Sequence, residues 1–391
     1  MKSKKIVIVN DGLGPNKGDQ AILLSMLDSL KHTLPDALIM TFPNSKMHQL
    51  GQYFEFWSAL KNADLFIFGG GQEIQDHASV AFLISGLLKL TLAKILSRPI
   101  FCYAIGVGPV ATGLGKLLIR LVLNQVDRIT VRDEESRKCL RQLGVMKPPC
   151  YVTADPCFAL VPANDRRARD IFSSEEIPET NGPRIAIAPR RWFHYRHYLL
   201  PMTFRAKFCS LRGQEEYNHL KKLIAKTADH LVATHKAQII FVPMRSAGSK
   251  FDPGQDDDQV SKEIIDLMRF KENVFLLKGD YSPKDLKAFL GQMDLVVGMR
   301  MHSMVLASMM DVPVVGIALS PKFSSFFKLI GQSEYLIPLE DLNYGTLVQK
   351  ISTALSRVEE IKKELRSRKK ALQELALSNV GYVQEMLKRG G

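Results

Sequence analysis

The sequence predicts an α/β protein made of two doubly wound parallel sheets that face a cleft, followed by a helical tail. Short β-branched runs alternate with amphipathic stretches twice along the chain, a pattern typical of parallel sheets covered by helices on both faces. With 391 residues, 46% of them hydrophobic, the chain is long enough to fill two cores. Residues 161–183 are polar and contain Pro and Gly, so we interpret them as the linker between the domains.

The first alternation defines an N-terminal domain at residues 1–165. Its charged start leads directly into the β-branched run KIVIV, which predicts a first strand and not a signal peptide. Further strands are expected near residues 37–42, 64–71, 100–108 and 127–133, and helices near 19–32, 80–99, 115–125 and 135–144. The apolar helix at 80–99 is interrupted by Lys89 and Lys94, so it does not span a membrane. It is either a core helix or a helix that dips into a membrane surface.

The second alternation defines a C-terminal domain at residues 180–340. Strands are expected near residues 184–189, 237–243, 274–279, 294–300 and 312–318, with helices near 218–235, 256–270, 282–293 and after His302. Residues 341–391 are helical and carry charges of both signs, which is typical of a solvated face. We assign this tail no catalytic role.

The charge balance narrows the class of partner. A net charge of +13 fits anionic partners such as phosphorylated metabolites or membrane headgroups. The sequence shows no Lys/Arg-rich arm and no RNA-recognition signature, so no nucleic-acid partner is expected. Its five cysteines are scattered and never spaced C-x-x-C, which indicates a reducing compartment without a zinc site. We expect a cytoplasmic protein and leave open a peripheral contact with the inner membrane surface.

The first polar cluster is NDGLGPNKGDQAIL, residues 10–23, where glycines separate a strand from a helix that we expect Asp19 to cap. Free amides at a helix start attract anions, which makes Gly18 and Asp19 candidates for a ligand site. The spacing G-x-G-x-x-x-G differs by one residue from the dinucleotide fingerprint, so NAD binding is not expected. A tight turn with a purely structural Asp19 is the alternative.

Two glycine-rich turns follow later strands, FGGGQEIQD at residues 68–76 and AIGVGPV at residues 104–110. Consecutive glycines usually mark the close approach of a ligand or of another element, so Gly70 and Gly71 are candidates for substrate binding. Glu73 and Asp76 follow them. Each is either a base or a helix cap, and the sequence leaves this open.

Cations follow several of the predicted strands. Arg132 ends a strand in TVRDEES, where pairing with Asp133 or another acid is the simpler interpretation. Arg190 and Arg191 come directly after the first strand of the second domain, and the aromatic, basic continuation FHYRHY suits a loop that closes on a sugar. The acids of PGQDDDQ, residues 253–259, are interpreted as a helix N-terminus rather than a magnesium site.

The most informative stretch is GMRMHSMVLASMMDVPVVGIALSPKF, residues 298–323, which predicts strand, helix, strand and loop. Arg300 and His302 stand in the first turn of the helix, and Lys322 follows the next strand. Since neighbouring parallel strands end at one edge of a sheet, the three side chains can converge on one anion there. A histidine flanked by two cations at strand ends is best explained as a proton donor beside a bound anion.

Taken together, these motifs resemble the polysaccharide pyruvyl transferases. The resemblance rests on the order N-x-G-x-x-x-x-G-D, G-G-G, IGVGPV, VRDEES, DPCF at residues 155–158 and GMRMH followed by P, I and K, and it runs from about Asn10 to Lys322. It implies a two-domain, Rossmann-like architecture similar to the GT-B glycosyltransferases. It also implies transfer of a pyruvyl unit from phosphoenolpyruvate to a sugar of a cell-surface polysaccharide or its lipid-linked precursor, as a ketal. The DGLGPNK turn is longer than the family turn we would expect.

The resemblance and the residues together give the expected site. His302 and Asp19 are the expected catalytic residues, and the expected substrate-binding residues are Arg132, Arg190, Arg191, Arg300, Lys322, Gly18, Gly70, Gly71 and Glu73. Arginine and lysine suit the phosphate and carboxylate of phosphoenolpyruvate, and a histidinium can protonate its methylene carbon. No metal and no cofactor are required by this scheme. The alternatives are a GT-B glycosyltransferase that uses a nucleotide sugar and a non-catalytic binder of anionic glycans.

Overall fold

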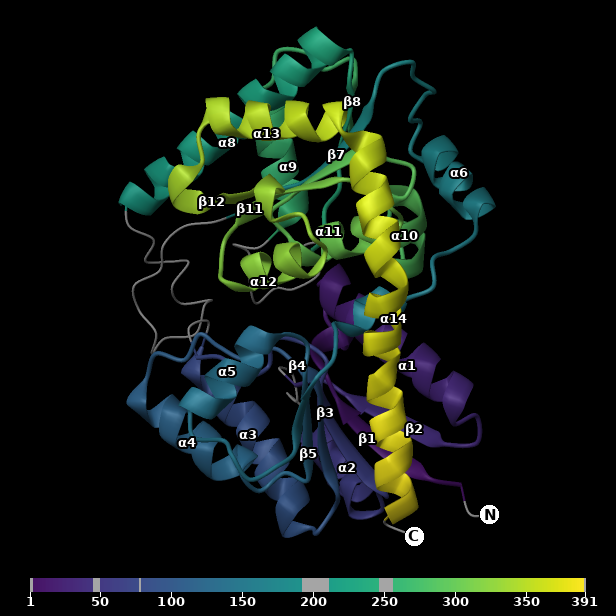
Figure 1. Cartoon of the computed structure of the whole chain (residues 1–391), viewed down its shortest axis with the longest axis vertical. Helices are drawn as coiled ribbons and strands as arrows, with labels where there is room; N and C mark the ends of the chain where they lie inside the picture. The colour runs from purple at the N-terminus through teal and green to yellow at the C-terminus, as the bar shows by residue number, and fades with distance from the viewer. Residues whose placement is uncertain (1–2, 45–49, 77–78, 192–210, 246–255, 390–391) are drawn as a thin grey trace.

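A computed structural model describes residues 3–44, 50–76, 79–191, 211–245 and 256–389. It shows two parallel six-stranded sheets, each covered by helices, stacked along the long axis of the molecule (Figure 1). The predicted fold class is therefore confirmed. The FHYRHY loop at residues 193–198 lies outside the described residues.

The N-terminal sheet has the strand order β2-β1-β3-β4-β5-β6. Its strands are β1 (Lys5–Val9), β2 (Leu38–Phe42), β3 (Leu65–Gly69), β4 (Ile100–Ile105), β5 (Arg128–Val131) and β6 (Cys150–Val152). Its helices are α1 (Lys17–Thr33), α2 (Leu50–Lys61), α3 (Val80–Ile95), α4 (Gly113–Leu123) and α5 (Glu134–Gln142), and the short helix η2 (Pro156–Ala159) follows β6. The side chains of α2, α3 and α4 share one core cluster, while α1 packs on the opposite face.

The C-terminal sheet has the strand order β12-β11-β10-β7-β8-β9. Its strands are β7 (Arg184–Ala188), β8 (Gln238–Phe241), β9 (Val274–Leu276), β10 (Leu295–Gly298), β11 (Val314–Ala318) and β12 (Leu336–Pro338). Its helices are α6 (Asp165–Ser174), α8 (Leu211–His235), α9 (Asp257–Leu267), α10 (Pro283–Leu290), α11 (Met301–Ser308), α12 (Lys322–Leu329) and α13 (Tyr344–Ser356).

The last helix, α14 (Val358–Arg389), runs from the C-terminal domain down the side of the N-terminal domain (Figure 1). Its Asn379 is fully buried and accepts hydrogen bonds from Thr130 at 2.6 Å and from Thr153 at 3.1 Å. On its outer side, Tyr382 stacks on Tyr151 with ring centroids 4.7 Å apart. The charged tail is thus a long strap between the domains and not only a solvated face.

Several elements differ from the expectation. The strands β6 and β12 and the helix α2 were not predicted, and α6 lies within the segment interpreted as a linker. Residues after β11 form the helix α12 rather than a loop, so Lys322 stands in its first turn. The cap of α1 is Asn16, whose side chain accepts from the Gly18 amide at 3.0 Å; the prediction that Asp19 caps this helix was wrong.

The apolar helix α3 is 16 residues long. Among the helices of the described ranges, none combines the length and the apolar character that crossing a bilayer requires.

Candidate functional site

The strand registers bring the polar segments of each domain to one sheet edge. In the C-terminal domain Gly298 of β10 lies level with Ala188 of β7 and Gly316 of β11, so the residues that follow these three strands emerge side by side. The order of strands reverses between β7 and β10, and such a switch point is where ligands of open α/β sheets bind. The predicted residues Arg190, Arg300 and His302 follow these two strands.

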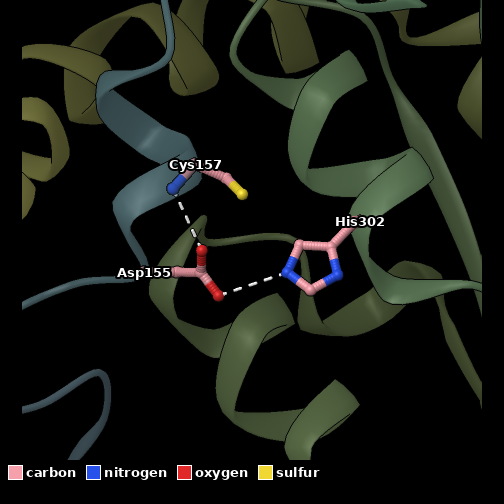
Figure 2. Close-up of side chains that lie close together, drawn as sticks. All are labelled: Asp155, Cys157 and His302. Atoms are coloured by element: carbon pink, nitrogen blue, oxygen red, sulfur yellow. Dashed lines mark hydrogen bonds and ion pairs between the residues drawn. The ribbon is translucent and has the colours of Figure 1, made fainter. Parts of the chain in front are cut away.

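A contact between the domains holds His302. Its Nε2 lies 3.4 Å from Oδ2 of Asp155, a buried residue at the start of η2 in the N-terminal part of the chain (Figure 2). The other oxygen of Asp155 accepts from the backbone amide of Cys157 at 3.0 Å, which fixes the carboxylate. The imidazole is therefore oriented by a carboxylate that is itself held in place.

The charge of Asp155 is stabilised by its neighbours. Burial opposes ionisation, but His302 and Arg132 hold the pKa of Asp155 well below its usual range. Arg132 Nη1 lies 3.2 Å from the same Oδ2 that faces His302. Asp155 is thus an ionised carboxylate that can accept a hydrogen bond from His302.

Asp155, Cys157 and His302 also form a cluster whose ligand-type atoms all lie within 4.8 Å of one another. Two observations favour an ion pair over a metal at this place. The Arg132 guanidinium occupies one side of the Asp155 oxygen. Burial raises the pKa of the Cys157 thiol well above its usual value, so the thiolate that a metal needs is disfavoured.

Arg132 is buried and has three polar neighbours. Besides Asp155, its guanidinium lies 3.8 Å from Asp133 and donates to the side-chain oxygen of Gln72. The close approach requires Gly106, because a side chain there would begin 2.8 Å from Nη2 of Arg132. The second glycine-rich turn therefore makes room for the Arg132 side chain. The close contact expected at this turn is a contact with Arg132.

Lys322 is a predicted site cation that forms no ion pair with a described residue. Burial, together with Arg132 and Arg190 nearby, lowers the pKa of Lys322 from 10.5 to about 7. Within the ranges that the structure describes, its ammonium has no hydrogen bond or ion pair. It lines a small cavity whose walls are polar at Arg132, Asp133, Asp155 and Ser325 and otherwise apolar, as at Phe158 and Phe326. An anion in this cavity would pair with Lys322.

A second polar group near Lys322 also lacks a partner. The hydroxyl of Ser320, at the end of β11, is buried and has no hydrogen-bond partner in the described part of the chain. A hydroxyl can donate to a phosphate or carboxylate oxygen, so Ser320 is a further candidate for anion binding.

Arg300 is placed beside this site but is already paired. Its Nε and Nη2 donate to the two oxygens of Asp257 at 2.9 and 2.7 Å, and both residues are buried. The acids of residues 253–259 are described from Asp256 onward, where Asp256 caps α9 and Asp257 holds Arg300. The helix N-terminus expected there is present, and one of its acids balances a predicted site arginine.

The two arginines that follow β7, Arg190 and Arg191, have different neighbours. Arg190 lies close enough to Lys322 to lower its pKa. Arg191 stacks on Tyr217, with its Cζ 5.0 Å from the ring centroid, and reaches Gln214 at 3.4 Å. Of the two, Arg190 is the one that adds positive charge beside Lys322.

Gly18 and Asp19 lie at the start of α1, opposite His302. A Cβ on Gly18 would stand 2.3 Å from Nδ1 of His302, so only glycine leaves room for the imidazole. Asp19 accepts from the Asn16 side chain at 2.7 Å and raises the pKa of Lys322. Both residues thus lie at the interface between the domains near Lys322.

The first glycine run has mainly a packing role at Gly70. This residue has φ of +98°, and a Cβ on it would meet Ile22 and Met26 of α1 within 2.6 Å. The element that approaches the first glycine run closely is therefore α1. Gly71 accepts from the Gly106 amide at 2.8 Å and joins the two glycine-rich turns.

Glu73 is a buried carboxyl on the N-terminal side of the site. Burial, with Asp11 and Asp19 nearby, raises the pKa of Glu73 well above its usual value, although Asn44 donates to it at 2.8 Å. Lys89 of α3 donates to the Asn44 carbonyl at 2.7 Å, and burial lowers the pKa of Lys89 to about 8. Asp76, by contrast, accepts from the amides of residues 111 and 112 and holds the turn before α4.

Sequence reasoning placed Asp155 only in the DPCF motif, took Asp257 only as part of a helix N-terminus, and gave Gln72 no role. Asp155 had a usable signal, because an acid directly before proline at the end of a short strand favours a helical turn capped by its side chain. Gln72 and Asp257 interact with residues 60 and 43 positions away, and no local pattern marks such partners.

Comparison with known proteins identifies the family. The family model described as polysaccharide pyruvyl transferase matches residues 16–321, most of the chain. No curated protein sequence matches significantly. The motif resemblance is thereby confirmed.

Solved structures share the fold at low sequence identity. The UDP-GlcNAc 2-epimerase from Neisseria meningitidis bound to UDP-GlcNAc has a TM-score of 0.62 and 10% identity, over 98% of this chain and 100% of that one. Sucrose-phosphate synthase from Thermosynechococcus elongatus has a TM-score of 0.56 and 12% identity, over 99% and 100%. Anabaena HepE in complex with UDP and glucose has a TM-score of 0.57 and 14% identity, also over 99% and 100%. At these identities the likeness shows the GT-B-like fold alone.

Proposed function

Because the chain belongs to the polysaccharide pyruvyl transferase family, we propose that it transfers a pyruvyl group from phosphoenolpyruvate to a sugar of a cell-surface polysaccharide or its lipid-linked precursor. The observation that carries this proposal is the ammonium of Lys322, which forms no ion pair with a described residue and is set among Arg132, Arg190 and Arg300 beside the Asp155–His302 pair. Phosphoenolpyruvate carries a phosphate and a carboxylate, and a cluster of cations beside a proton donor suits both groups.

In the proposed mechanism, Lys322 and Arg132 bind the donor anion, with Arg190 adding positive charge. Arg300 contributes its charge while it remains paired with Asp257. His302 protonates the methylene carbon and generates an oxocarbenium-like centre at the neighbouring carbon. A sugar hydroxyl attacks that carbon, inorganic phosphate leaves, and a second hydroxyl of the sugar closes the ketal.

Both ring nitrogens of His302 have close neighbours. Asp155 faces Nε2, while Nδ1 faces Gly18 at the start of α1. Asp155 then acts as a positioning residue that keeps the ring in orientation. Asp19 and Glu73 lie on the opposite, acidic side, where a carboxylate can accept the proton of the sugar hydroxyl.

Thermal unfolding with different ligands tests the proposal. Phosphoenolpyruvate should stabilise the protein by about 2.7 kcal/mol at a concentration of about 100 times its Kd. UDP- and GDP-sugars should give no comparable shift. A stabilising shift from nucleotide sugars without one from phosphoenolpyruvate would favour the glycosyltransferase alternative. Binding of glycan without phosphate release would indicate a non-catalytic binder.

A further inference from the structure

The layer of helices on one face of the N-terminal sheet exposes an unusual set of apolar side chains. On α4, Leu114, Leu117 and Leu121 are 53%, 52% and 54% exposed. The same helix buries Gly115, Ile119 and Leu123. At about 100° per residue, the three leucines lie on the side of the helix opposite to the buried one. The three leucine side chains are therefore directed away from the core.

The neighbouring helix continues this surface. α3 packs beside α4, and its Leu88 and Ile95, seven residues apart on one stripe, are 62% and 70% exposed (Figure 1). Leu88, Ile95, Leu114, Leu117 and Leu121 together are called the docking face. In the same layer, α2 exposes three aromatic side chains, Tyr53, Phe54 and Trp57. Tyr and Trp are enriched where a protein meets the headgroup region of a bilayer.

The two helices of the docking face carry charges of one sign. Between Asp76 and Asp127 the chain contains no Asp or Glu, and Lys94, Arg98, Lys116 and Arg120 lie in this stretch. Lys116 and Arg120 are exposed on α4, to one side of the leucine stripe. An apolar stripe flanked by Lys and Arg on an amphipathic helix matches the chemistry of an anionic bilayer surface.

We propose that this face docks on a membrane bilayer that carries anionic lipids. A second copy of the chain is a poorer occupant, because a two-fold contact would bring Lys116 and Arg120 against the same residues of the other copy, with no acid in either helix. The helices do not cross the bilayer, so the contact is peripheral.

The docking face is connected to the candidate site. Residues 106–112 lead from Gly106, which lies against Arg132, to Thr112, which caps α4. Docking therefore places the N-terminal, acidic side of the site near the bilayer surface. This assignment rests on the proposed function, and it identifies the acceptor class as a sugar carried on a membrane lipid.

Vesicle cosedimentation of the full chain tests the proposal. The protein is mixed with sucrose-loaded vesicles of phosphatidylcholine, alone or with phosphatidylglycerol, without phosphoenolpyruvate. We expect binding to the anionic vesicles that falls as salt is raised, and weaker binding to the neutral ones. A triple variant should bind the anionic vesicles at least about tenfold more weakly; it combines Leu114→Ser, Leu117→Ser and Leu121→Ser. A double variant with Lys116→Glu and Arg120→Glu should show a loss of the same size.

Matched controls lie on α14. Leu375→Ser with Leu377→Ser, and Lys370→Glu, change exposed residues away from the docking face and should leave vesicle binding unchanged. The proposal is wrong if the wild type does not bind anionic vesicles, or if the leucine variant binds them as well as its control. It is also wrong if the leucine variant converts a dimer of the wild type to a monomer.

Phosphate release separates this test from that of the proposed function. With a soluble acceptor that lacks a lipid, the docking-face variants should release phosphate from phosphoenolpyruvate at the wild-type rate. If the wild type binds vesicles but never uses phosphoenolpyruvate, the proposed function fails while the docking face stands.

Discussion

Gly18 and His302 come from different domains, and a methyl group on Gly18 would stand 2.3 Å from Nδ1 of the imidazole. The first turn of α1 therefore forms the wall against which the ring rests, while Asp155 faces its other nitrogen. The position of His302 depends on both domains, and each contact can be tested separately.

Gly18→Ala should displace the His302 ring without removing any charged group. A misplacement of about 1 Å can lower kcat by about 10²-fold, and this is the size of the loss we expect. The matched control is Gly381→Ala in α14, where an added Cβ meets nothing within 4 Å. The control should keep full activity and gain up to about 1 kcal/mol in the free energy of unfolding. Equal kcat for both variants would contradict the claim that Gly18 sets the position of the His302 ring.

Asp155→Asn should remove the charge that faces Nε2 of His302 while keeping the shape. We expect kcat to fall by about 10²- to 10⁴-fold, the range seen when the orienting carboxylate of a catalytic histidine is neutralised. Steady-state kinetics and chemical denaturation measure activity and stability separately. A variant with reduced stability but unchanged kcat would assign Asp155 a structural role only.

His302→Gln keeps approximate size and hydrogen bonding but removes the acid. We expect kcat to fall by about 10²- to 10⁴-fold, with the Kd for phosphoenolpyruvate changed only slightly. Rapid-quench kinetics and calorimetry measure the two quantities. Near wild-type kcat would remove His302 from the acid role and leave Asp19, Glu73 or an ordered water as candidates.

The affinity for phosphoenolpyruvate should depend on pH through Lys322, whose pKa is lowered to about 7. Below this pH the ammonium is charged and binds the donor. Above it, binding must take up a proton, so the Kd should rise by up to about tenfold per pH unit. Lys322→Arg should flatten this rise, because a guanidinium stays charged. A wild-type Kd that does not change between pH 6 and 9 would contradict the assignment.

The two cations at neighbouring strand ends should differ in their effect on folding. Arg300→Met leaves Asp257 as a buried carboxylate without its partner, which should lower the free energy of unfolding by about 3–5 kcal/mol. Lys322→Met removes a half-buried charge that forms no ion pair with a described acid, so the free protein should be at least as stable as the wild type near pH 6, where the charge opposes folding. Chemical denaturation measures both, and a similar loss of stability for both variants would contradict the difference in pairing.

Much of the fold could be predicted because most elements are long and regular in pattern. The strand KIVIV and the helix at 282–293 carry their own periodicity and caps, and both are present as β1 and α10. The strands β6 and β12 have three residues each, too few for a pattern to show. The helix α2 has an exposed aromatic side, which weakens the amphipathic signal.

The candidate site could be predicted only in part. His302, Arg132 and Lys322 were found because each follows a strand, and strand ends meet at one edge of a parallel sheet. Their partners are set by tertiary packing. Sequence alone gives no reason why Asp257 pairs with Arg300 while Lys322 forms no ion pair with a described residue, and this difference is why we propose Lys322 as the binding cation.

The most direct measurement is the mass of a glycan acceptor after incubation with the protein and phosphoenolpyruvate, with phosphate release followed in the same reaction. The account predicts that the acceptor gains the mass of phosphoenolpyruvate less that of phosphoric acid, with one phosphate released per acceptor modified. It also predicts that His302→Gln shows neither the mass gain of the acceptor nor the release of phosphate. Transfer of a sugar from a nucleotide sugar to the same acceptors, without any gain from phosphoenolpyruvate, would contradict it.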